Sequence, residues 1–285
     1  MSELKALLDA LAAHAPYGRA VMITLVSLDG SGYRKPGARM LVADDGWSIG
    51  SVSGGCIENM LREHAARVMT RDAAELIEID TTSADDVLFG SGLGCPGRLR
   101  FRFEPFARSD FDARFGAVRE ALLARKEGML DGDVIEPPIA LHIFGAGNDV
   151  APMVALAAAM QWETAVHGKH EAPGELKLDA RSAAVLMSHN YFVDLDWLRC
   201  VLRTDAGYIA IVGSRGRMEM IRGVLRDEGE PEWSLSRLRG PAGLDIGSET
   251  PAEIALAVLA EVKAVLAGRD GTPLTERARD TVSRA

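Results

Sequence analysis

The first candidates for chemistry in this sequence are its cysteines and the residues beside them. Cys56 ends the stretch SIGSVSGGC and directly precedes a run with helical apolar spacing. Glycine-rich backbone can turn its N–H groups toward an anion, and a helix N-terminus favours a thiolate over a thiol. A thiolate can bind a soft metal or take part in sulfur transfer. Cys56 could equally be a small side chain packed at a crowded turn, so both interpretations stay open.

The other two cysteines differ in their surroundings. Cys95, in GSGLGCPGRLRF, is enclosed by turn residues, which predicts a sharply bent exposed loop and a second candidate thiol. Cys200 falls in DLDWLRCVL, where helical spacing indicates packing. Because the three cysteines lack CxxC spacing, the sequence predicts neither a disulfide framework nor a self-contained zinc knuckle.

Two segments of the first half could hold an anion. Arg34, Lys35 and Arg39 stand beside three glycines in DGSGYRKPGARM, where they could clamp a phosphate or carboxylate or could form a solvated basic turn. Both alternatives stay open. The polar and glycine residues before Cys56 are the matching backbone candidates: Ser53, Gly54 and Gly55.

In the second half, FGAGNDVAP follows an expected strand, as a dinucleotide-binding loop would. Gly145 and Gly147 match that fingerprint, but Val150 occupies its third small position. The next strand ends in AVHGKH without the usual acidic residue, so a phosphate-bearing ligand near Lys169 is favoured over ordinary NAD. His189, expected at the carboxyl edge of the sheet, is a further candidate. The second half is expected to provide a second phosphate-binding edge through Gly145, Gly147, Ser214 and Arg215.

Bulk properties narrow the class of protein. The chain has 285 residues and a formal net charge of -9, which argues against a generic binder of nucleic-acid phosphates. No apolar run approaches the roughly 18 to 20 residues of a membrane span, and the first 18 residues have the charged, amphipathic pattern of a helix and not of a signal peptide. Sparse cysteines favour a reducing compartment, so we expect a cytoplasmic protein.

The elements that position these residues indicate two α/β domains. Residues 1–128 combine expected strands over 20–30, 38–55 with a turn at 44–46, 74–81 and 97–105 with helices over 56–69 and 111–125 and an N-terminal helix that ends near Pro16 and Gly18. Gly, Asp and paired Pro residues over 129–138 predict a linker. Residues 139–285 alternate strands and helices at the spacing of a doubly wound parallel sheet of Rossmann-like type.

Seven segments in series resemble the xanthine dehydrogenase accessory protein family, XdhC/CoxI. They are GSGYRKPGARMLV, GSVSGGCIE and LGCPGRLRFRFEP in the first half, then LHIFGAGNDVAPMVALA, VLMSHNYFVDLDWL, YIAIVGSRGR and PAGLDIGSETPAEIALAVLAEV. The resemblance covers nearly the whole chain and implies a mixed α/β XdhC/CoxI-type domain followed by a Rossmann-like domain.

The resemblance also implies a function. Family members look like maturation factors that bind molybdenum cofactor (molybdopterin), assist its sulfuration with a cysteine desulfurase, and deliver it to an apo molybdenum hydroxylase. They are chaperones more than catalysts. The resemblance carries Cys56 and Glu58 over as an intact GGC-x-E motif, and Cys56 and Cys95 become candidate molybdenum contacts. A homodimer is one alternative for the assembly of this chain.

Four positions depart from the pattern common in the family, as expected for a divergent subgroup that serves another target or a dinucleotide form of the cofactor. They are Asn148 for His, Gly168-Lys169 for Asp-Arg, Ser188-His189-Asn190 for Thr-His-Asp, and Cys95-Pro96-Gly97 for Cys-Gly-Gly. Two rival functions remain: an NAD(P)-dependent oxidoreductase, which predicts saturable NAD(P)H binding, and a pure protein-interaction module, which predicts partner binding that is independent of Cys56 and Cys95.

Overall fold

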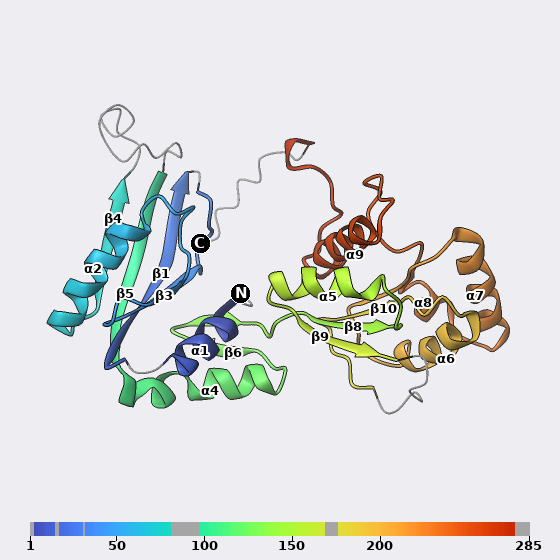
Figure 1. The fold of residues 1–285 in the computed structure, drawn as a ribbon, viewed down its shortest axis with the longest axis horizontal. Helices are drawn as coiled ribbons and strands as arrows, with labels where there is room; N and C mark the ends of the chain where they lie inside the picture. The colour runs from blue at the N-terminus through green and yellow to red at the C-terminus, as the bar shows by residue number, and fades with distance from the viewer. Residues whose placement is uncertain (1–2, 15–16, 31, 81–96, 169–175, 277–285) are drawn as a thin grey trace. The chain divides into compact units, whose positions relative to one another are not determined.

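A computed structural model describes residues 3–14, 17–30, 32–80, 97–168 and 176–276. The chain divides into two compact units, residues 1–137 and 138–285, and each is described by itself. Figure 1 shows an antiparallel sheet with helices in the first unit and a helix-covered sheet in the second.

The N-terminal unit is built on a five-stranded antiparallel sheet in the order β3-β2-β1-β5-β4. Its elements are α1 (Glu3–Ala13), β1 (Arg19–Gly30), β2 (Arg39–Ala43), β3 (Ser48–Gly50), α2 (Glu58–Arg71), β4 (Glu75–Asp80), β5 (Gly97–Ala107), the 3-10 turn η1 (Arg108–Asp110), α4 (Phe111–Leu123), β6 (Gly128–Leu130) and β7 (Asp133–Ile135).

Helices cover both faces of this sheet because β1 is apolar on both sides. Ala20 and Met22 join the core under α1 and α4, whereas Val21 and Ile23 join the core under α2. Successive side chains of a strand point to opposite faces, so one strand contributes to both cores. Burying both faces fixes α2, and with it the loop that precedes α2.

The expected linker over 129–138 contains a β-hairpin instead of an extended connection. β6 and β7 pair antiparallel, with Leu130 opposite Asp133, and turn at Asp131 and Gly132, both with positive φ. The Gly and Asp residues of this segment therefore belong to a tight turn. The units divide at Pro137–Pro138, and the hairpin belongs to the first.

The C-terminal unit is a parallel sheet in the order β12-β11-β10-β8-β9, which confirms the Rossmann-like prediction. Its elements are β8 (Ala140–Phe144), α5 (Val150–Ala159), β9 (Glu163–His167), β10 (Ser182–Leu186), α6 (Tyr191–Val201), β11 (Tyr208–Ile211), α7 (Arg215–Asp227), α8 (Glu232–Leu235), β12 (Leu238–Arg239), α9 (Pro251–Leu266) and η2 (Leu274–Glu276).

Strand order locates the ligand-binding edge of this unit. In chain order the strands run 2-1-3-4-5, so the connections leave β8 and β10 in opposite directions. Ligands of doubly wound sheets bind outside the carboxyl ends of the strands at such a switch point. Ala183 and Val185 of β10 pack under α5 and α9, while Ala184 and Leu186 pack under α6 and α7, so helices cover both faces.

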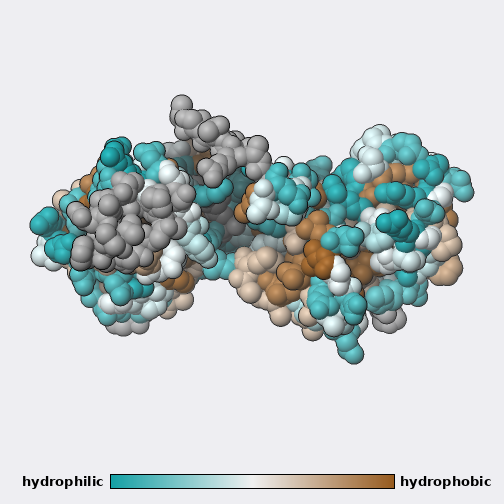
Figure 2. All heavy atoms as spheres, turned by 90° about the horizontal axis from the view of Figure 1, so that it is seen from above, coloured by the Kyte–Doolittle hydropathy of each residue, from teal (hydrophilic) through white to brown (hydrophobic). Residues whose placement is uncertain are grey.

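On the face seen in Figure 2, both units show hydrophilic residues with apolar patches between them. None of the helices in the described ranges has the length and apolar character of a membrane span.

Candidate functional site

The buried side chain of Glu58 holds the loop that carries Cys56 through hydrogen bonds. We call residues 51–57 the GGC loop. Glu58, the first residue of α2, is only 5% exposed, and its Oε1 accepts hydrogen bonds from the Ser51 hydroxyl at 2.7 Å and the Ser53 N–H at 3.1 Å. The Ser53 hydroxyl donates to Oε2 at 2.5 Å. Three donors on one carboxylate fix the first half of the loop.

The electrostatic state of Glu58 follows from the same contacts. Burial raises the pKa of the carboxyl, but hydrogen bonds from Ser53, Ser51 and the backbone outweigh burial and lower the pKa below its ordinary value of 4.5. Glu58 is therefore ionised at neutral pH, with its oxygens turned to the loop. The structure gives it, like buried Ser53, a positioning role in the loop.

Gly54, Gly55 and Cys56 form the exposed crest of the GGC loop. Gly55 has a φ of 100°, a conformation that side chains disfavour, and its N–H donates to the Ser53 hydroxyl at 3.2 Å. The Cys56 thiol lies 3.8 Å from the same hydroxyl. Ile57, the N-cap of α2, provides no side-chain cap, and within the described residues the Asn59 and Met60 N–H groups have no side-chain acceptor. Cys56 is an exposed thiol and not a packed one.

The basic loop over 32–37 lies beside the GGC loop. A Cβ placed on Gly54 would lie 3.4 Å from Cγ of Tyr33, whose side chain is 78% exposed. Tyr33 thus adds an aromatic face at the crest, which sequence reasoning missed. A lone aromatic residue between Gly and Arg was the available signal.

The cations near this loop are mostly engaged. Arg34 pairs with both oxygens of Glu3 on α1 and is half-buried. Arg39 is buried and pairs with Asp133 at 2.5 Å, so this residue is neither an accessible clamp nor part of a solvated turn. Two of the three basic residues are accessible to an anion. Lys35 is exposed, and Arg34 can exchange Glu3 for the anion.

Two candidate residues lie outside the described residues: Cys95 of the first half and Lys169 of the second. Within the described ranges, no group of three or more His, Cys, Asp or Glu side chains could hold a metal ion. Cys200 is half-buried on α6, as its helical spacing predicts.

At the switch point of the C-terminal unit, a carboxylate faces the glycine loop. His189 Nε2 lies 2.7 Å from Oδ2 of Asp149, and a Cβ on Gly147 would clash with Oδ1 of Asp149. The Gly145 N–H donates to the His167 carbonyl at 3.0 Å. A negative group beside Gly147 and an occupied Gly145 N–H disfavour a pyrophosphate here.

Gly145 is needed for close packing of two strands, and its replacement tests that role. A Cβ at this position would lie 2.6 Å from the Met187 carbonyl oxygen after β10. We expect Gly145→Ala to lower the free energy of unfolding of the C-terminal unit by about 1–3 kcal/mol. Thermal unfolding of the full chain measures this, with Gly216→Ala, which meets no atom within 4 Å, as the control. An unchanged transition would contradict the packing role.

The predicted residues Ser214 and Arg215 begin α7 at the same edge. The Ser214 hydroxyl accepts the Arg217 N–H at 3.3 Å and so caps the helix, and Arg215 is exposed. Sequence reasoning missed the neighbouring ion pair, in which Arg217 donates to the buried Asp194 of α6 at 2.6 Å.

Comparisons with known proteins agree with this architecture. The model of the XdhC and CoxI family matches residues 13–80, which include the GGC loop, and the model of the XdhC Rossmann domain matches residues 141–262. A Bacillus subtilis (strain 168) protein, named as a probable xanthine dehydrogenase subunit, is 27% identical over 330 residues, covering 92% of this chain and 97% of its own. The molybdenum cofactor insertion chaperone PaoD of Escherichia coli (strain K12) is 24% identical over 275 residues, covering 86% and 83%. A crystal structure described as a xanthine dehydrogenase from Bacillus halodurans superimposes with a TM-score of 0.80 at 25% identity, covering 95% of this chain and 97% of that one.

Proposed function

Since the chain belongs to the XdhC and CoxI family, we propose that it binds molybdenum cofactor as cargo and assists the insertion of that cofactor into an apo molybdenum hydroxylase of the xanthine dehydrogenase type. The similarity to a molybdenum cofactor insertion chaperone supports this proposal. The cargo combines a thiophilic metal with a phosphorylated pterin, so a site for it needs a soft ligand and hydrogen-bond donors.

The observation that carries the proposal is the presentation of Cys56. The thiol is exposed beside two exposed glycines and an uncapped helix start, while buried Glu58 holds the loop below. A soft sulfur ligand and the uncapped start of α2 thus lie next to each other in the chain. Arg34 and Lys35, on the neighbouring basic loop, are the cations for the phosphate.

Further parts of the proposal rest on the family resemblance. They are assistance in sulfuration, a cysteine desulfurase as partner and a second thiol contact from Cys95. The proposal also includes a homodimer, and a cytoplasmic location on the ground of the sparse cysteines. In this proposal the protein is a carrier, and the chemistry on the metal belongs to its partners.

The rival function, an NAD(P)-dependent oxidoreductase, finds no support at the switch point. Asp149 lies where a pyrophosphate would approach Gly147, and Gly145 has no free N–H. We therefore expect titration with NADH or NADPH to give no saturable binding.

Replacing Cys56 by alanine is expected to weaken retention of the cofactor at least about tenfold, because the metal loses its soft ligand. The purified full chain and its variant are loaded with isolated cofactor under reducing conditions, and molybdenum and pterin are measured per protein after gel filtration.

Cys200→Ala is the matched control, since this half-buried thiol lies on α6 in the other unit and should leave retention unchanged. A folded parent that retains neither molybdenum nor pterin would refute the carrier function. Equal retention by the parent and Cys56→Ala would remove Cys56 from the site.

A further inference from the structure

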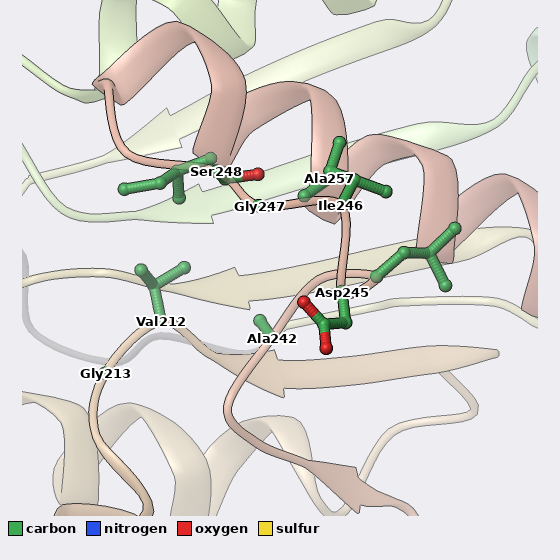
Figure 3. Close-up of a pocket in the computed structure, with 10 residues that line it drawn as sticks. Val212, Gly213, Ala242, Asp245, Ile246, Gly247, Ser248 and Ala257 are labelled. Atoms are coloured by element: carbon green, nitrogen blue, oxygen red, sulfur yellow. The ribbon is translucent and has the colours of Figure 1, made fainter.

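A second site is suggested by a cavity of about 360 Å³ beyond the carboxyl end of β11. Its walls are Val212 and Gly213 after β11, the loop over 242–248, and Ile254 and Ala257 of α9 (Figure 3). The volume lies near the lower end of the range of about 300–1,000 Å³ usual for small-molecule sites, so it suits one ring system. The cavity lies beyond β11, which β10 separates from β8 in the sheet, and none of its lining residues belongs to the glycine loop after β8.

The loop of this cavity is anchored to the sheet and to α9. The Ala242 N–H donates to the Ile211 carbonyl at 2.9 Å, and the Gly243 N–H donates to Oε2 of Glu261 at 2.7 Å. Tyr208 donates to the same oxygen at 2.7 Å. Burial, and then the Glu261 carboxylate, raise the pKa of Tyr208, so its hydroxyl keeps the donated proton. The cavity wall is thus pre-formed.

Two glycines with positive φ frame the tripeptide that faces the cavity. Gly243 has a φ of 109° and Gly247 a φ of 73°, and between them stand Leu244, Asp245 and Ile246. In Figure 3 the Asp245 carboxylate lies on the side of the loop that faces Ala242. Within the described ranges, Asp245 has no hydrogen bond or ion pair.

The chemistry of the walls limits what could bind. Six lining side chains are apolar, and they suit the faces of a flat ring: Val212, Ala242, Leu244, Ile246, Ile254 and Ala257. The Asp245 carboxylate only accepts hydrogen bonds, so the ligand must supply donors, and two adjacent N–H groups use both oxygens.

The cavity also offers hydrogen-bond donors, and the end of α9 beside it does not suit a phosphate. Gly247 and Ser248 have backbone N–H groups without a partner among the described residues, so the ligand also needs an acceptor. The start of α9 is closed by a capping box, in which Glu253 accepts the Thr250 N–H at 2.8 Å. An ammonium ligand has no acceptor for these N–H groups, and an anionic ligand would be repelled by the Asp245 carboxylate.

We propose that this cavity binds a flat heterocycle with a 2-amino-4-oxopyrimidine edge, as found in guanine and in pterins, with Asp245 accepting its two adjacent N–H groups. The cavity shares no residue with the GGC loop. If the ligand is a pterin, the inference rests on the proposed function, whose cargo contains that ring, and the Asp245 variant below tests the cavity separately from Cys56.

The test is equilibrium binding of guanosine and of a free pterin to the full chain, with adenosine as the ligand control because its ring lacks this donor edge. Binding of guanosine identifies a nucleoside as the source, and binding of the pterin identifies a pterin. Either result supports the shared chemistry if adenosine binds at least about tenfold more weakly.

Asp245→Asn should weaken binding of the ligand at least about tenfold, because the amide offers one acceptor and a mismatched donor. The matched control is Glu249→Gln, an exposed carboxylate that does not line the cavity. The proposal is overturned if the parent binds neither guanosine nor pterin, if adenosine binds equally well, or if Asp245→Asn binds as the parent does.

Discussion

Replacement of Asp194 by alanine is expected to lower the free energy of unfolding of the C-terminal unit by about 3–5 kcal/mol. The side chain is 1% exposed, and its two oxygens serve different elements. Oδ1 accepts the Ser188 hydroxyl at 2.5 Å after β10, and Oδ2 accepts Arg217 of α7 at 2.6 Å. Removing the carboxylate leaves the guanidinium half-buried without its partner, which is the costly way to break such a pair.

Urea unfolding of the full chain, followed by hydrogen exchange of peptides from each unit, measures this effect separately for the C-terminal unit. Asp196→Ala is the matched control, because Asp196 lies on the same helix, is 61% exposed and pairs with Arg199 at the surface. It should change the free energy of unfolding by less than about 1 kcal/mol. Equal effects of the two substitutions would show that the buried pair contributes no more than a surface pair.

The architecture was largely predictable because the period of the apolar residues indicates whether a helix or strand is buried on one face or on two. Helical spacing located α2 and α6, and runs of buried apolar residues located β8, β10 and β11. The β6–β7 hairpin was missed. Its strands have three residues each, too short for any periodicity, and its Asp131-Gly132 turn resembles a linker by composition.

The positioning residues were harder to predict, although they left a signal. Glu58 precedes the buried Leu61 by three residues, and Asp194 precedes the buried Trp197 by three, so each acid falls on the apolar stripe of its helix. A charge on a buried stripe requires partners. The partner of Asp194, Arg217, comes from another helix, and that of Glu58, Ser53, comes from the loop before α2, and the apolar period identifies neither of them.

Contacts between distant segments also limited the prediction of the candidate site. How loops meet at a sheet edge decides two contacts that the sequence does not show. Tyr33 lies against Gly54, and Asp149 faces Gly147 and pairs with His189. Residue types alone favoured a phosphate at Gly147. The carboxylate there changes that interpretation, because a folded chain brings together groups that the sequence separates.

Glu58 has the second large expected effect, and it links stability to the GGC loop. Glu58→Ala leaves the Ser53 N–H and the Ser53 hydroxyl without their acceptor and removes one of the two acceptors of the Ser51 hydroxyl, so we expect the free energy of unfolding of the N-terminal unit to fall by about 2–4 kcal/mol. The exposed Glu63 on the same helix supplies the control variant Glu63→Ala, with an expected change below about 0.5 kcal/mol.

The pH dependence of the Glu58 contribution has a defined sign. The pKa of this carboxyl is lower in the folded chain than its ordinary value of 4.5, so its stabilisation is fully present above that value and is lost as the pH falls through the lowered pKa. The stability difference between the parent and Glu58→Gln should therefore be largest near neutral pH and shrink below about pH 4.5. A difference that stays constant from about pH 7 to about pH 3 would contradict an ionised Glu58. Cofactor retention by Glu58→Gln at neutral pH should fall although Cys56 is intact, because the loop that presents the thiol loses its charged anchor.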